Sequence, residues 1–321
     1  MTMPNFLLLG TMKSGTTSLY YQLKQHPDIY MSPVKAPDFF ALEGRKWDFN
    51  GPEGQAAANY WTSQHKSTNI EEYRALFQGA SDEVAIGEAS PSYLYRPEAP
   101  SRIRHYIPEA KLIAILRDPA ERAYSQYCFA CLAGREPLSF VQALRAEEER
   151  IQNGYDWLYH YKNFGFYYTQ LKRYYEIFER DQLRVYLYDD LKDNPIGVVQ
   201  DIFRYLGGDD TFIPDNSWRF NPGGIPKNAA LHRFLKQPSK VKSVAKSLLP
   251  DRQARQAWER VLSLNLTEAP PMPQEVRREL VEKFRQDILN LQDLLERDLS
   301  GWLQMDSGFA HKAQIGSSMP R

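Results

Sequence analysis

The sequence predicts an α/β fold in three layers, with a central parallel sheet flanked by helices. Two observations predict it. Short apolar runs of strand length alternate along the chain with longer segments of helix composition. The strand-like runs are apolar almost throughout, which is typical of strands buried on both faces. The length of 321 residues, with 42% hydrophobic and 25% charged residues, suits one large globular domain.

The first apolar run, at residues 6–9, ends at a glycine and predicts the first strand. The clearest later strand is "KLIAILRD", a continuous apolar run. Asn69 is expected to cap a helix that stops at Gly79, and Pro119 is expected in the first turn of another. The expected strands are residues 6–9, 83–88, 111–118 and 183–191, and the expected helices are residues 17–25, 69–79, 119–134, 164–178, 195–208 and 273–299.

These elements place the whole sheet before about residue 206. Mostly helical sequence follows it, with no second domain boundary. We therefore expect one domain over residues 1–305 and a flexible C-terminal tail at 306–321. Within that domain, "RAEEER" at residues 145–150 is expected to be a solvated helix surface. The basic segment 236–255 is expected to be a solvated face, with contact to an anionic acceptor as the alternative.

Charge and cysteine content bound the class of protein. Forty basic and forty acidic residues cancel, so no overall field favours nucleic acid or an anionic membrane. The start of the chain lacks a signal-peptide pattern, and no apolar stretch is long enough to predict a membrane span. The two cysteines, Cys128 and Cys131, are expected to be buried or half-buried thiols in a reducing compartment. Together these features predict a cytoplasmic protein.

The first strand runs into "GTMKSGTTS", which has the parts of a phosphate-binding loop. Gly10 and Gly15 allow a tight turn and a close approach to a ligand, and the following helix directs free N–H groups at it. The loop departs from the nucleoside-triphosphate pattern G-x-x-x-x-G-K-[ST], because Thr16 stands where that pattern has lysine. Its lysine is Lys13, inside the loop, where it would reach a group at the near end of the phosphate and not the junction of the β- and γ-phosphates.

Several motifs resemble those of one enzyme family. "KSGTTSL" resembles the 5′-phosphosulfate loop of sulfotransferases that use 3′-phosphoadenosine 5′-phosphosulfate (PAPS), and "LIAILRDPAERAYSQY" resembles their 3′-phosphate motif. "GEASPSYLY" resembles the segment after the third strand in glycan sulfotransferases, and "LYDDL" and "LERDLSGW" resemble family patterns. The resemblance covers most of residues 5–302. It implies a P-loop-like fold and transfer of a sulfuryl group from PAPS, without a metal, to a hydroxyl or amine of a glycan or small molecule. The product would be adenosine 3′,5′-bisphosphate.

The resemblance also implies roles for particular residues. Lys13 would stabilise the departing bisphosphate, and Glu88 would act as general base. Lys35 matches a basic position near the acceptor cleft. Lys227 loosely matches a family loop that closes over the nucleotide. The implied donor-binding residues are Lys13, Ser14, Gly15, Thr16, Thr17, Ser18, Arg117, Ser125 and Lys227.

Physical reasoning supports the roles of three of these residues. PAPS carries two anionic groups, so it needs two anion sites, and the fixed fork of Arg117 at a strand end suits the second. Ser125, about two turns into the next helix, can add a hydroxyl. Glu88 ends a strand near the loop, where partial desolvation would suit a base. The rival base, His105, lies in a segment that is expected to be solvated.

Other interpretations remain open. Arg117 could form a structural ion pair with Asp118, and Asp118 could instead hold magnesium in a P-loop kinase or hydrolase that acts on ATP. A non-catalytic nucleotide-binding protein would keep the same fold. The six histidines show no metal-ligand spacing, which predicts no metal site. The sequence does not identify the acceptor.

Overall fold

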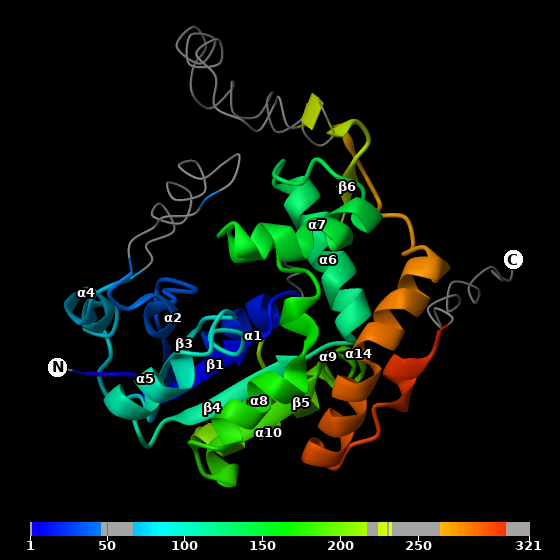
Figure 1. The fold of residues 1–321 in the computed structure, drawn as a ribbon. Helices are drawn as coiled ribbons and strands as arrows, with labels where there is room; N and C mark the ends of the chain where they lie inside the picture. Colours follow the sequence, from blue (N-terminus) through cyan, green and yellow to red (C-terminus); the bar gives the residue numbers. More distant parts are fainter. Residues whose placement is uncertain are drawn as a thin grey trace, which may run out of the picture.

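The computed structural model describes residues 2–45, 50, 67–216, 224–229, 231–232 and 264–305. Its centre is a five-stranded, all-parallel sheet in the order β2-β3-β1-β4-β5 (Figure 1). The strands are β1 Phe6–Gly10, β2 Ile29–Met31, β3 Ala85–Ala89, β4 Lys111–Leu116 and β5 Leu183–Leu187.

Helices cover both faces of this sheet. On β1, Leu7 belongs to a core that also contains Leu171 and Phe284, whereas Leu8 belongs to a second core with Leu19 and Ile202. Because neighbouring side chains on a strand point to opposite faces, the two cores are the two interfaces of a three-layer fold. The principal helices are α1 Thr16–Leu23, α2 Phe39–Leu42, α4 Ile70–Ala75, α5 Ala99–Tyr106, α6 Pro119–Leu132, α7 Phe140–Gln152, α8 Tyr167–Tyr175, α9 Tyr188–Asp193, α10 Pro195–Leu206 and α14 Gln274–Leu295.

The predicted fold class is confirmed: a P-loop-like, three-layer α/β fold with a parallel sheet. The four expected strands are β1, β3, β4 and β5, and the sheet is complete before residue 206. Asn69 caps α4, since its side chain accepts the amide of Glu72 at 2.8 Å, and Pro119 opens α6. The helix expected to reach Gly79 ends earlier, at Ala75. The domain boundaries stay a prediction, because residues 306–321 lie outside the described part of the chain.

Two local expectations about the sheet need correction. The strand expected over residues 183–191 ends at Leu187, because Asp190 accepts the amide of Leu187 at 3.2 Å and the chain turns into α9. The edge strand β2 was not predicted. It is only three residues long, and it pairs with β3 in parallel at Ile29 and Ala85.

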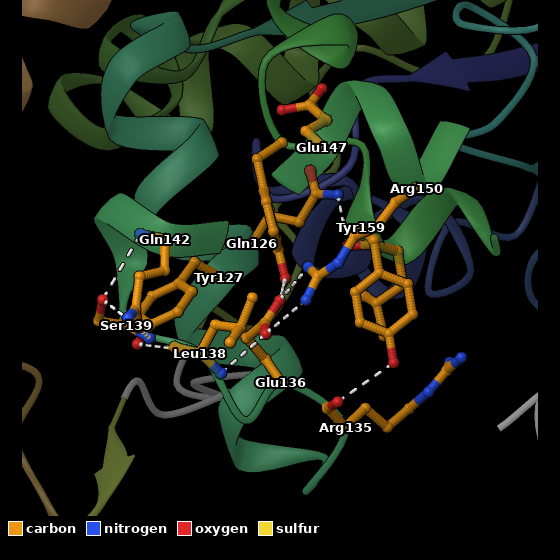
Figure 2. A network of polar contacts seen from close by, with 12 residues as sticks. Gln126, Tyr127, Arg135, Glu136, Leu138, Ser139, Gln142, Glu147, Arg150 and Tyr159 are labelled. Atoms are coloured by element: carbon orange, nitrogen blue, oxygen red, sulfur yellow. Dashed lines mark hydrogen bonds and ion pairs between the residues drawn. The ribbon is translucent and has the colours of Figure 1, made fainter. Parts of the chain in front are cut away.

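The expectation of a solvated surface at residues 145–150 is wrong for two of its residues. Glu147 is completely buried and accepts the amides of Lys162 and Asn163, with its shortest contact at 2.7 Å. Arg150 is also buried and forms two hydrogen bonds to Glu136, of 2.6 and 3.0 Å (Figure 2). Charged groups can be buried when they are paired, and here the partners come from outside α7.

A short antiparallel pair lies beyond the main sheet: β6 Ile225–Pro226 and β7 Leu266–Thr267. None of the helices in the described ranges is long and apolar enough to cross a membrane. The basic segment 236–255 lies outside the described residues, so its expected exposure stays a prediction.

Candidate functional site

The loop between β1 and α1 requires both of its glycines. Gly10 has a φ of 138°, and a Cβ atom there would lie 2.7 Å from the carbonyl oxygen of Pro91. Gly15 has a φ of 90°, and a Cβ atom would lie 3.0 Å from the Leu191 side chain. Other residues rarely adopt such φ values. A side chain at Gly10 would also clash with the backbone, whereas one at Gly15 would require the Leu191 side chain to shift. The loop therefore packs closely between the segment after β3 and helix α9.

This loop forms a cradle suited to an anion. Helix α1 starts directly after Gly15, which offers no side-chain cap, so the amides of the first turn are available to a ligand. Ser14 and Thr11 are almost completely buried, yet their hydroxyl oxygens have no hydrogen-bond partner within the described part of the chain. Buried hydroxyls are normally paired. Amides and hydroxyls without partners, gathered at a helix N-terminus, fit a bound phosphate or phosphosulfate group.

Two cations lie close together beside the cradle. Arg117 Nη1 donates to the carbonyl oxygen of Lys13 at 3.2 Å, and the guanidinium carbon lies 4.9 Å from the ring centre of Tyr188. Lys13 Nζ lies 4.8 Å from the ring centre of Phe129. Burial, followed by the positive charge of Arg117, lowers the pKa of Lys13 to about 8. The two positive charges therefore interact with each other, and an anion bound near both would be favoured.

Ser125 lies on the same side of α6 as contacts to both cations. Glu121 lies 3.9 Å from Arg117, and Phe129 contacts Lys13. Because residues four apart share one face of a helix, Ser125 lies between those two contact points. The structure therefore brings the half-exposed Ser125 to the side of α6 that faces the loop.

Asp118 is used by other partners. Its carboxylate caps α6 by accepting the amides of Ala120 and Glu121, and it forms an ion pair with Arg277 at 2.8 Å. The alternative that Arg117 pairs with Asp118 is therefore wrong, since the acidic contact of Arg117 is Glu121. Across the described ranges, no group of three or more histidine, cysteine or acidic side chains could hold a metal ion. Metal independence stays a prediction.

Glu88 lies at the same end of the sheet as the loop. The residues after β3 bond to the end of β1: the Ser90 amide donates to the Leu8 carbonyl at 3.1 Å. Glu88 itself is completely buried and accepts hydrogen bonds from Tyr73 at 3.2 Å and Ser90 at 2.8 Å. Burial, the largest effect, raises its pKa to about 7. The expected partial desolvation is therefore complete. A fully desolvated carboxylate with this pKa can exchange a proton near neutral pH.

The remaining candidates are placed differently. Lys35 is half-buried, and the amide of its neighbour Ala36 donates to the Ala89 carbonyl at 3.0 Å, so this segment runs beside the end of β3. Lys227 is exposed, and its ammonium donates to the Leu264 carbonyl at 3.0 Å. The contacts described for Lys227 do not join it to the loop.

Two further expectations are confirmed. The rival base His105 is exposed on α5, which precedes β4 and so lies at the opposite end of the strands from the loop. The thiols of Cys128 and Cys131 are buried and half-buried, and both are free. Burial raises their pKa values, to about 11 for Cys128 and about 12 for Cys131. Such thiols are poor nucleophiles at neutral pH.

Sequence reasoning missed the residues that surround the candidates. Ser90 had a visible signal, because residues two apart on a strand share a face, and Ser90 follows Glu88 by two positions. Tyr73 and Tyr188 had none, since tyrosines are frequent in this chain. Arg277 reaches the site from α14, far along the sequence.

Comparisons with known proteins agree with this geometry. A family model described as the sulfotransferase family matches residues 4–211. The solved structure of a sulfotransferase from Alicyclobacillus acidocaldarius is 32% identical and superposes with a TM-score of 0.72, covering 95% of this chain and all of that one.

The chain spans less than a third of the length of two curated relatives that it matches. Bifunctional heparan sulfate N-deacetylase/N-sulfotransferase 4 of Mus musculus is 28% identical over 317 residues, which are 95% of this chain and 31% of that protein. Membrane-associated sulfotransferase kil1 of Dictyostelium discoideum is 38% identical over 128 residues, 40% of this chain and 23% of that protein. The family match covers well over half of the chain and contains the loop, Glu88, Arg117 and Ser125, so this protein belongs to the sulfotransferase family.

Proposed function

We propose that this protein transfers a sulfuryl group from PAPS to a hydroxyl or amine of a carbohydrate or small-molecule acceptor. One observation carries the proposal: Lys13 and Arg117 lie beside a helix N-terminus, and the buried hydroxyls of Ser14 and Thr11 there have no hydrogen-bond partner among the described residues. That arrangement supplies separate contacts for two anionic groups on one nucleotide. In this proposal residues Ser14–Ser18 bind the 5′-phosphosulfate, and Arg117 and Ser125 bind the 3′-phosphate.

The chemistry asks for charge stabilisation and one proton transfer. In-line sulfuryl transfer, like phosphoryl transfer, depends on positioning and on donors aimed at the charge that develops on the leaving group. Lys13 is assigned to that leaving oxygen. Its lowered pKa reflects poor solvation, which strengthens its interaction with an arriving anion. Glu88 is assigned to the acceptor proton, because its pKa of about 7 suits a base near neutral pH.

The acceptor is proposed only by class. The names of the relatives include enzymes that act on heparan sulfate, and the carbohydrate part of the proposal rests on that similarity. Lys35 is a candidate for acceptor contact because its segment follows the strand end that carries Glu88. Lys227 remains a candidate for the donor only by its resemblance to a family loop. The cytoplasmic location stays a prediction.

A kinase or hydrolase that uses ATP and magnesium is the alternative. Two observations weigh against it. Thr16 stands in place of the lysine of the triphosphate loop, and Asp118 is held by Arg277 and by the amides of α6. A non-catalytic nucleotide-binding protein would bind the same ligand without turnover.

Calorimetric titration tests the proposal. We expect adenosine 3′,5′-bisphosphate to bind without metal, and Arg117→Ala to weaken that binding by about tenfold or more, as loss of a charged hydrogen bond does. The matched control is Arg180→Ala, since Arg180 is an exposed arginine that pairs with Glu296. Binding of ATP with magnesium, and none of the bisphosphate, would overturn the proposal. Bisphosphate binding without transfer to any acceptor from labelled PAPS would favour the non-catalytic alternative.

A further inference from the structure

The carboxylate of Glu121 lies between two arginines from distant parts of the chain. Its Oε2 is 3.9 Å from Nη2 of Arg117, and its Oε1 is 3.0 Å from Nη1 of Arg277. The carboxylate is therefore closer to Arg277. This matters because Arg117 can direct its guanidinium either to Glu121 or to a bound phosphate.

Arg277 is committed to this place. It lies on α14, is almost completely buried, and donates to Asp118 at 2.8 Å, to Glu121 and to the Gln304 carbonyl at 3.1 Å. Asp118 is the N-cap residue of α6, directly after Arg117, and Glu121 lies in the first turn of the helix. Among the described residues, the cations that interact with Glu121 are Arg117 and Arg277. Without Arg277, the partly desolvated carboxylate of Glu121 would attract the guanidinium of Arg117 more strongly.

Other contacts hold the main chain and the guanidinium group of Arg117 in place. The buried Tyr167 donates from its hydroxyl to the Arg117 carbonyl at 2.9 Å, which fixes the main chain at the end of β4. The Tyr188 ring lies against the guanidinium, and the Lys13 carbonyl accepts from Nη1. The main remaining choice for the outer nitrogen, Nη2, is between Glu121 and an incoming anion.

We propose that Arg277 is a positioning residue of the donor site: by holding Glu121, it leaves the guanidinium of Arg117 available for the 3′-phosphate of the nucleotide. The inference rests on the proposed function, and it extends the donor site to the C-terminal helix α14. It makes Glu121 a competitor of the phosphate and Arg277 the group that neutralises this competitor.

Two ligands separate positioning from general damage. Adenosine 3′,5′-bisphosphate carries the 3′-phosphate and adenosine 5′-monophosphate lacks it, so the ratio of the bisphosphate dissociation constant to the monophosphate dissociation constant reports on the contacts to the 3′-phosphate, Arg117 among them. We expect Arg277→Gln to weaken bisphosphate binding about tenfold and to leave binding of the monophosphate within about twofold. Glu121→Gln should bind the bisphosphate at least as tightly as the unchanged protein. Adding Glu121→Gln to Arg277→Gln should restore most of the lost affinity.

The outcomes that overturn the inference are distinct. Equal weakening of both ligands in Arg277→Gln would mean that Arg277 only supports the fold. The same would follow if the double variant stayed as weak as Arg277→Gln. If Arg277→Gln does not fold, Glu121→Gln decides, because its amide oxygen still accepts from Arg277; weaker bisphosphate binding in this variant would overturn the inference.

If the proposed function itself were wrong, the binding experiments would give a different result. In that case the unchanged protein would not bind the bisphosphate, or Arg117→Ala would leave the ratio of the two dissociation constants unchanged. If Arg117→Ala raises the ratio of the bisphosphate to the monophosphate dissociation constant and the Arg277 and Glu121 variants do not change it, only the present inference fails.

Discussion

Two charged regions, one before α6 and one after it, are built on opposite principles. The loop cluster consists of Lys13, Arg117 and the buried hydroxyl of Ser14. The α7 cluster consists of Glu136, Glu147, Arg150 and Tyr161. In the α7 cluster, Glu136 accepts two hydrogen bonds from Arg150 (Figure 2). It accepts a third, of 2.6 Å, from Tyr161. In the loop cluster two cations are adjacent and the buried hydroxyl has no described partner.

The difference separates structural charge from functional charge. A buried charge whose partners are all supplied by the protein adds rigidity and has no capacity left for a ligand. Like charges with unpaired hydroxyls cost stability in the free protein, and a bound anion offsets that cost. Removing a cation from the loop cluster should therefore leave the protein as stable or more stable, whereas removing a charge from the α7 cluster should destabilise it.

The largest effect is expected at Glu88, beside the loop cluster. As general base it should contribute about 10²–10⁴-fold to the rate of transfer, so Glu88→Gln should lose that factor and keep its affinity for the bisphosphate.

The stability of the protein should also depend on the ionisation of Glu88. Its folded-state pKa of about 7 lies above the ordinary 4.5, so the native protein binds the extra proton and its stability falls as pH rises through that window. The variant should lack this fall and be the more stable protein at about pH 8, measured by thermal unfolding at both ends of the window.

Full transfer activity in Glu88→Gln would remove it as the base. An unchanged pH dependence of unfolding would show that the carboxylate is not desolvated in solution. Glu83→Gln is the matched control, since Glu83 is a half-exposed glutamate just before the same strand.

Arg150→Met tests the α7 cluster. It leaves the carboxylate of Glu136 buried without its counter-charge, which should lower the free energy of unfolding by about 3–5 kcal/mol. Adding Glu136→Leu should recover much of this loss, because the pair is then replaced rather than broken. Denaturant unfolding measures both effects, and Glu149→Gln, an exposed neighbour on α7, is the control. A loss no larger than that of the control would show that the cluster is not structural.

Lys13→Ala should lower the activity and leave the stability of the protein unchanged or higher, in contrast to Arg150→Met. Loss of one donor to the leaving group should slow transfer about 10²–10³-fold. The lowered pKa of Lys13, about 8 against an ordinary 10.5, means that the native protein releases this proton more readily, so the charged lysine costs stability below about pH 8 and the cost fades toward 10.5. The variant should therefore unfold at the same or a higher temperature near neutral pH. Lower stability together with lower activity would place Lys13 among the structural charges.

Local sequence determined most of the fold and the composition of the loop. The apolar runs specify β1, β3, β4 and β5, because a strand buried on both faces needs apolar residues along its whole length. The loop could also be predicted from its glycines, because the ability of Gly10 and Gly15 to adopt positive φ values is a property of the residue itself. Arg117 and Glu88 could be predicted as site residues because each is a charged residue at the end of an apolar strand.

Only the tertiary structure decided which charges are buried and with what partners. Nothing in "RAEEER" distinguishes the buried Glu147 from the exposed Glu149, because burial depends on the amides of Lys162 and Asn163, which the fold brings beneath α7. In the same way, Glu121 meets Arg277 only when α14 packs beside α6. Secondary structure follows from neighbours in sequence, whereas the free energy of a buried charge depends on partners that any part of the chain can supply.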